Sequence, residues 1–131
     1  MEIELFALAD YAADQAGKLT IVGIFDTILG GVSPVVHPRC TVAIKLRFEK
    51  MEEGTKHLRL TLTDADGQLA LPSIEIPMEV QMADDQHTIT RQVVANFDNL
   101  KFEEFGEYSF DLAVDEMHEA SIPLFVRQMN V

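Results

Sequence analysis

The stretch Leu100–Val126 reads L-K-F-E-E-F-G-E-Y-S-F-D-L-A-V-D-E-M-H-E-A-S-I-P-L-F-V and decides the fold class. Apolar and polar residues alternate over Glu107–Asp115, and the same period of two returns over Glu119–Met129. Such alternation is typical of half-buried β-strands. Asp115-Glu116 supplies a short acidic turn between the two segments. The stretch therefore predicts a β-hairpin of the kind that closes a β-sandwich domain.

The same period of two recurs along the rest of the chain. It is clearest in the segments Thr41–Glu49, His57–Thr63, Ser73–Met82 and Thr88–Phe97. The polar linker Lys50–Lys56 contains Gly54, and it predicts that the strands on either side of it pair as a hairpin. Proline cannot donate to a β-ladder, so Pro77 and Pro123 predict edge strands.

The first thirty residues have two interpretations. Ile3–Ala16 is rich in Ala and Leu and fits a helical stripe, but Leu19–Phe25 fits the return arm of a hairpin whose first arm is Glu2–Ala9. Because helix propensity is a weak guide that packing often overrides, the strand–loop–strand interpretation is favoured. Gly23 would then mark a bulge in the second arm.

These patterns predict one all-β domain spanning residues 1–131. Its expected fold is a single antiparallel β-sandwich of seven or eight strands, immunoglobulin-like in outline. Tyr108 stands where such folds carry a tyrosine that pins a corner of the chain.

Several short motifs also carry a family resemblance. They are Ala9-Asp-Tyr-Ala12, Gly17-Lys-Leu-Thr-Ile-Val-Gly23, Phe25-Asp26, the Val42–Phe48 strand and Gly106-Glu-Tyr-Ser-Phe. Together they resemble a family of small bacterial proteins of unknown function. The resemblance implies a compact β-sandwich in the bacterial cytoplasm and transfers no catalytic residue. The family pattern has an Asp-Gly turn in the final hairpin, where this chain has Asp115-Glu116.

Charge and cysteine content narrow the function. Ten basic and 22 acidic residues give a net charge of −12, which disfavours nucleic acid and anionic membranes as partners. Cys40 is the only cysteine, so no internal disulfide can form, and core filling is its expected role. The N-terminus shows no signal peptide, and cytoplasmic location is expected. No nucleophile–base pair or cofactor motif is readable, so we expect no cofactor and no enzymatic activity.

One group of cations runs against this acidity. In the predicted hairpin Lys45, Arg47 and Arg59 share the solvent face, with Arg47 opposite Arg59. Like charges opposed across strands cost stability, so a neutralising group is expected. Glu75 or Glu79 on the following strand would serve. The alternative is an acidic partner surface, which makes the three cations a candidate binding site.

Acidic loops supply the second candidate site. If the strands alternate in direction, the loops carrying Asp10 and Asp14, Glu52 and Glu53, Asp84 and Asp85, and Asp115 and Glu116 project from one end. Of these, Asp84, Asp85, Asp115 and Glu116 are the candidate ligands for a hard cation such as Ca²⁺. Turn formation and solubility are the competing explanation.

The sequence thus favours a non-catalytic domain that binds a protein partner or a second copy of itself. The alternative is a small-ligand or Ca²⁺-binding module that uses the acidic loops.

Overall fold

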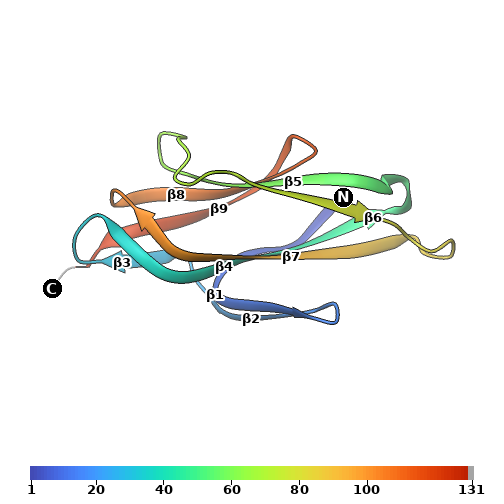
Figure 1. Cartoon of the computed structure of the whole chain (residues 1–131), viewed down its shortest axis with the longest axis horizontal. Helices are drawn as coiled ribbons and strands as arrows, with labels where there is room; N and C mark the ends of the chain where they lie inside the picture. The colour runs from blue at the N-terminus through green and yellow to red at the C-terminus, as the bar shows by residue number, and fades with distance from the viewer. Residues whose placement is uncertain (130–131) are drawn as a thin grey trace. The chain divides into compact units, whose positions relative to one another are not determined.

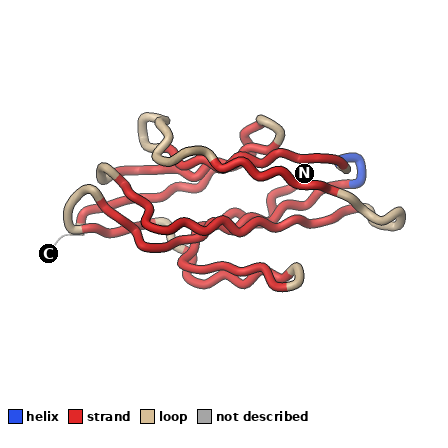
Figure 2. The backbone as a smooth tube through the Cα atoms, viewed as in Figure 1, coloured by secondary structure: helices blue, strands red, loops and turns tan. Residues whose placement is uncertain are grey.

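The computed structural model describes residues 1–129, and most of its trace is β-strand, with one short 3-10 helix, η1 (Lys50–Glu52) (Figure 2). In these residues the strands are β1 (Glu2–Gln15), β2 (Lys18–Ile24), β3 (Thr27–Gly30), β4 (Val35–Glu49), β5 (Gly54–Thr63), β6 (Ile74–Val80), β7 (Thr88–Phe102), β8 (Gly106–Val114) and β9 (Met117–Gln128). The predicted all-β class is confirmed. Residues 3–16 are strand, as favoured, and not helix.

The strands labelled in Figure 1 form two sheets, in the orders β2-β1-β4-β7 and β3-β9-β8-β5-β6. Two expectations need correction here. The described residues hold nine strands and not seven or eight, and the added strand β3 runs parallel to β9, so the pairing is not wholly antiparallel. A four-residue strand is too short to display a period of two, so β3 could not be predicted from the pattern.

The predicted hairpin between β4 and β5 is wrong. β4 pairs with β1 and β7 in the four-stranded sheet, whereas β5 pairs with β8 and β6 in the other. Between them lies η1, whose capping box joins Glu49 and Glu52. An alternating strand can satisfy its buried face beside many neighbours, so the pattern alone does not choose the partner.

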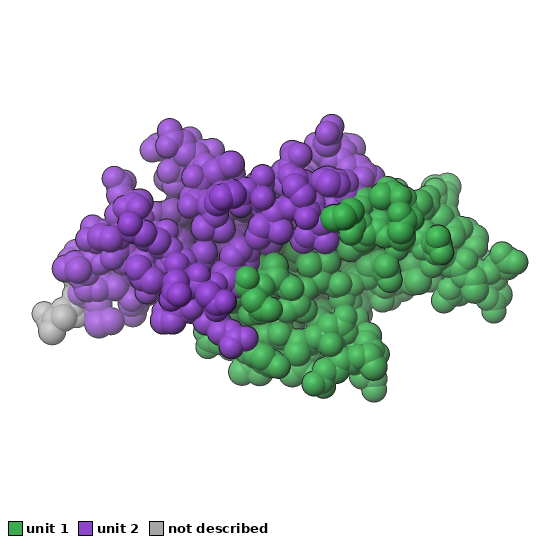
Figure 3. All heavy atoms as spheres, viewed as in Figure 1, with its two compact units in different colours: residues 1–25, 40–56, 77–96 green, residues 26–39, 57–76, 97–131 purple. Residues whose placement is uncertain are grey.

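The chain divides into two compact units (Figure 3). Unit 1 comprises Met1–Phe25, Cys40–Lys56 and Pro77–Asn96. Unit 2 comprises Asp26–Arg39, His57–Ile76 and the chain from Phe97 onward. The boundaries fall inside β4, β5, β6 and β7. The single domain over residues 1–131 stays a prediction.

In unit 1, β1 changes partner half-way along its length. Its first half pairs with β4, from Glu2↔Arg47 to Ala9↔Thr41, and its second half pairs with β2, from Ala9↔Ile24 to Gln15↔Lys18. Asp10 and Asp14 therefore lie on a strand and not in the loop expected for them. The core of this unit includes Val42, Ile44, Leu46 and Phe48, all fully buried, together with the predicted core residue Cys40.

Gly23 does not mark the expected bulge, because the β1–β2 register is constant on both sides of it. Its φ is +72°, a backbone region that favours glycine. A Cβ built at this position would also come within 2.6 Å of the Asp10 carboxylate. Glycine is needed here for its backbone conformation and for the space that Asp10 occupies.

In unit 2 the predicted closing hairpin is confirmed as β8 and β9. Asp115 and Glu116 form the turn with φ of 49° and 68°, the positive values of a type I′ turn. Phe110 is fully buried, and its ring centroid lies 5.5 Å from that of Phe97 on β7. The Phe102 and Tyr108 rings meet edge to face at 4.9 Å.

The two proline predictions have different outcomes. β6 ends its sheet, so Pro77 lies on an edge strand as expected. β9 lies between β3 and β8, so the edge prediction from Pro123 is wrong. β3 begins its pairing at Phe125, two residues after Pro123, so the missing N–H removes no bond to β3.

Candidate functional site

The predicted stripe of cations is divided between two separate ion-pair groups. In unit 1, Arg47 Nε lies 2.5 Å from Glu4 Oε2 and Lys45 Nζ lies 3.4 Å from Glu4 Oε1. Arg47, aided by Lys45, holds the pKa of the Glu4 carboxyl below its ordinary value. The register places Arg47 opposite Glu2 and not opposite Arg59.

Arg59 belongs to unit 2 and is neutralised by Glu75, one of the two acids predicted for this role. Arg59 Nε lies 2.7 Å from Glu75 Oε1, and His57 Nε2 lies 2.6 Å from Glu75 Oε2. Arg59, and after it His57, lowers the pKa of Glu75. Each cation thus has a carboxylate partner inside its own unit. Partner binding by Lys45, Arg47 and Arg59 stays a prediction.

The four candidate cation ligands also lie in different units. Asp84 and Asp85 are exposed in the β6–β7 loop of unit 1, and Asp115 and Glu116 form the β8–β9 turn of unit 2. Asp115 Oδ1 accepts a hydrogen bond from the backbone N–H of His57 at 2.9 Å. Among residues 1–129, no group of three or more His, Cys, Asp or Glu side chains is arranged to hold a metal ion. The cation-binding alternative therefore rests on the sequence alone.

A polar network on β5, β8 and β9 is the clearest arrangement of reactive side-chain types in unit 2. Asp111 accepts hydrogen bonds from the hydroxyls of Thr63, Ser109 and Ser121. His118 Nε2 lies 2.7 Å from Ser121 Oγ. In a catalytic triad the carboxylate orients the histidine, whereas here Asp111 binds the serine itself. The network therefore joins strands and lacks the order of a nucleophilic relay.

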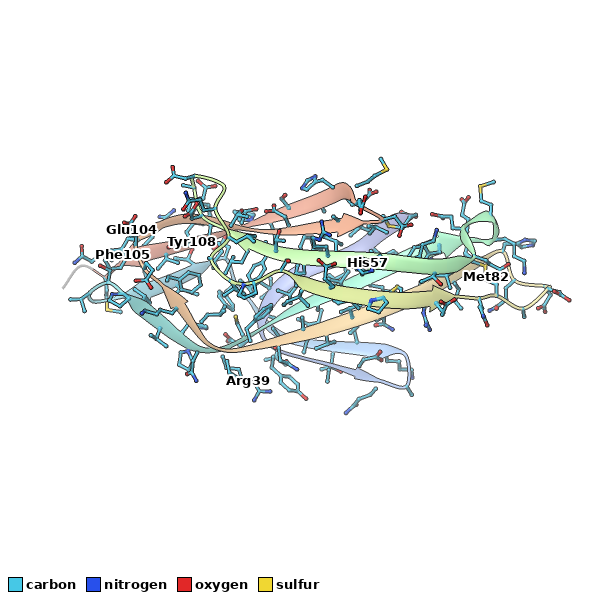
Figure 4. All side chains as sticks on the ribbon, turned by 45° about the horizontal axis from the view of Figure 1, so that its top comes forward. Arg39, His57, Met82, Glu104, Phe105 and Tyr108 are labelled. Carbon is cyan, nitrogen blue, oxygen red and sulfur yellow. The ribbon has the colours of Figure 1, made fainter. Side chains whose placement is uncertain are left out.

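A shallow hollow of about 470 Å³ adjoins this network. Its lining includes Asp64, Glu107, Tyr108 and Ser121. The Tyr108 hydroxyl donates to the backbone carbonyl of Glu104 at 2.8 Å, and Figure 4 labels both residues. Burial raises the pKa of Tyr108. Asp64 Oδ1 is already engaged by the N–H groups of Asp66 and Gln68, which gives it the turn-forming role.

The feature that sequence reasoning missed is the outer face of the β1–β2 hairpin. Tyr11 pairs with Val22 across the two strands, and Ile24 lies two residues further along β2, opposite Ala9. These side chains are 44%, 54% and 65% exposed. On the opposite side of the hairpin, Ala12 is buried and its partner Ile21 is half-buried.

The hairpin is held in place by contacts within unit 1. The Gln92 side chain on β7 donates to the carbonyl of Gly17 in the turn, and Phe25 N–H donates to the Leu8 carbonyl at 3.0 Å. Part of the signal for this surface was present in the sequence, because Val22 falls on the same phase of its strand as the polar Lys18 and Thr20. Tyr11 gave no such signal, since it shares its phase with alanines. Only the register shows that Tyr11 and Val22 meet.

A family model described as a family of unknown function (DUF6941) matches residues 4–127. The chain belongs to this family. The DUF6941 match begins within β1 and ends within β9, so it includes both the hairpin surface and the polar network. It confirms the expected likeness to a family of unknown function, while bacterial origin and cytoplasmic location stay predictions. No curated protein matches the DUF6941 chain. Within residues 1–129, no helix is long and apolar enough to cross a membrane.

Proposed function

We propose that this protein is a non-catalytic protein-interaction domain of the bacterial cytoplasm. The observation that carries the proposal is the apolar outer face of the β1–β2 hairpin. Single exposed apolar residues are common on protein surfaces, but adjacent ones on an edge strand are typical of contact sites. Tyrosine is also among the residues enriched at interfaces.

The proposal includes an immunoglobulin-like β-sandwich as the scaffold. Two observations in unit 2 support it. The Phe97–Phe110 and Phe102–Tyr108 ring contacts join strands that belong to different sheets. The Tyr108 hydroxyl binds a backbone carbonyl four residues upstream, as the corner tyrosine of such folds does.

The proposal is tested by capturing partners from a lysate of the native host on the immobilised chain. Ile24→Lys places a charge on the outer face, and Met51→Lys makes the same change at an exposed position outside the hairpin. We expect the wild type and Met51→Lys to retain the same proteins, foreign or a second copy of the chain, and Ile24→Lys to lose them. Enrichment of no protein at all, the chain itself included, would overturn the proposed function.

A second candidate is the binding of a small cationic ligand in the hollow beside Tyr108. Its specific support is the pairing of a concave surface with the carboxylates of Asp64 and Glu107. Melting curves with Ca²⁺ and with polyamines test this candidate. A midpoint that rises with a ligand in the wild type but not in Glu107→Gln would support it, and an unchanged midpoint at millimolar concentrations would remove it.

A further inference from the structure

We propose that the partner of the hairpin is a second copy of this chain, joined antiparallel through β2. The inference rests on the proposed function and names its occupant. β2 is the end strand of its sheet, and within residues 1–129 no strand pairs with its outer side. An unpaired edge is a template for another extended strand.

The backbone groups available for pairing follow from the hairpin geometry. Gln15 and Lys18 flank a two-residue turn at Ala16 and Gly17, both of which have positive φ. In the pair of residues that flank such a turn, the N–H of each residue bonds to the C=O of the other, and every second pair along the hairpin repeats this arrangement. Thr20 and Val22 therefore point their N–H groups toward β1. The N–H groups of Leu19 and Ile21 point outward to the free edge.

The composition of β2 suits a second copy as the occupant. The chain carries 22 acidic residues and a net charge of −12, so two copies repel over most of their surface. β2 contains no Asp or Glu, and Lys18 is its only charged residue. The other arm of the hairpin carries Asp10 and Asp14. The acid-free arm is the one whose outer side is unpaired along its whole length among residues 1–129.

Antiparallel pairing about a two-fold axis at Ile21 suits this composition. It places Lys18 of one copy opposite Ile24 of the other, and Thr20 opposite Val22. No like charges are opposed, and the lysine stem lies along an aliphatic side chain. The axis joins the two outer faces into one continuous surface. The three other edge strands are less suited, since β6 contains Pro77, β3 has only four residues and β7 carries an acid, Asp98.

Sedimentation equilibrium over a concentration series tests the proposal with the full chain. One strand pair buries less than the roughly 1,200 Å² of a standard interface, so we expect weak association. The mean mass of the wild type should rise above 14.7 kDa as the concentration increases. Val22→Glu should raise the dissociation constant at least about tenfold, which is roughly one lost side-chain contact.

Two further variants keep the test decisive. Thr20→Glu changes a second exposed position on β2 and should weaken association as Val22→Glu does. Met117→Glu adds the same charge at an exposed position outside the hairpin and should associate as the wild type does. Circular dichroism melting shows that each variant is folded.

The outcomes separate this inference from the proposed function. Association that Val22→Glu and Thr20→Glu leave unchanged would overturn β2 as the surface, although the interaction domain would stand. A wild-type mass that stays at 14.7 kDa at every concentration would overturn the self-pairing altogether. Capture of foreign proteins from the host lysate would then decide the proposed function independently.

Discussion

The molecule contains two hairpins with the same turn chemistry and opposite surfaces. Both β1–β2 and β8–β9 close through two residues with positive φ. β8–β9 lies inside its sheet between β5 and β3, whereas no strand within residues 1–129 pairs with the outer side of β2. The outward polar side chains of β8–β9 bind one another around Asp111, while β1–β2 presents Tyr11, Val22 and Ile24. The strand edges and outward polar groups of β8–β9 are therefore paired within residues 1–129, whereas the outer side of β2 is not.

The largest expected difference between the hairpins is in how much a truncated side chain lowers the free energy of unfolding. Phe110→Ala removes a fully buried ring that packs against Phe97, and it should lower the free energy of unfolding by about 3–5 kcal/mol. Val22→Ala on the other hairpin should change it by less than about 0.5 kcal/mol. Urea unfolding of dilute protein measures both. Similar costs for the two variants would contradict the distinction between a buried and an exposed hairpin.

Substitutions on the outer face of β8–β9 should have the next largest effect on the free energy of unfolding. Asp111→Ala leaves the hydroxyls of Thr63, Ser109 and Ser121 without their common acceptor, and should cost about 2 kcal/mol in urea unfolding. Ser109→Ala removes one donor and should cost about 1 kcal/mol or less. Equal losses for the two variants would show that the network does not depend on its carboxylate.

The shared turn type predicts a smaller gain in stability. Glu116 adopts a φ of 68°, where a side chain other than that of glycine is strained. Glu116→Gly restores an Asp-Gly turn and should raise the free energy of unfolding by about 0.5–1 kcal/mol. Asp115 is kept because it binds the His57 N–H. A thermal midpoint that falls in this variant would mean that the Glu116 side chain makes a stabilising contact.

The two ion-pair groups give the smallest expected effect, since exposed pairs contribute little to stability. The pKa values of Glu4 and Glu75 are lowered by their arginine partners. A carboxyl with a lower pKa in the folded state adds stability above its unfolded pKa and loses it as the pH falls through the folded value. Unfolding free energy should therefore decline below about pH 4.5, the ordinary value for glutamate.

Glu4→Gln and Glu75→Gln check this assignment. Each variant should show a shallower decline than the wild type when unfolding is followed between pH 5 and about pH 3. A decline that is unchanged in both variants would assign the acid sensitivity to other carboxyls.

The sequence predicted where the strands lie better than it predicted which strands pair. Alternating runs identified β4, β5, β6 and β8 because a buried face imposes a period of two wherever the strand lies. The pairing of β4 with β5 was wrong because the same period is satisfied beside any neighbour. β3 was missed because four residues cannot show a period. The edge prediction from Pro123 was wrong because β3 begins to pair with β9 only at Phe125, so the N–H that Pro123 lacks is not needed for that pairing.

The candidate site was predicted only in part. The neutralisation of Arg59 by Glu75 followed from the expected order of β5 and β6. The pairing of Lys45 and Arg47 with Glu4 did not, because it required β1 to lie beside β4. The exposed face of β1–β2 was hidden for a related reason. Its side chains come from both arms of the hairpin, and only the register brings Tyr11 and Val22 together.

The central claim is that the outer side of β2 pairs with a second copy, and amide hydrogen exchange followed by NMR tests it most directly. The N–H groups of Leu19 and Ile21 point to the free edge, whereas those of Thr20 and Val22 are bonded to β1. Pairing predicts that exchange at Leu19 and Ile21 slows as the protein concentration rises, while exchange at Thr20 and Val22 stays the same. Exchange rates at Leu19 and Ile21 that do not depend on concentration would contradict the claim.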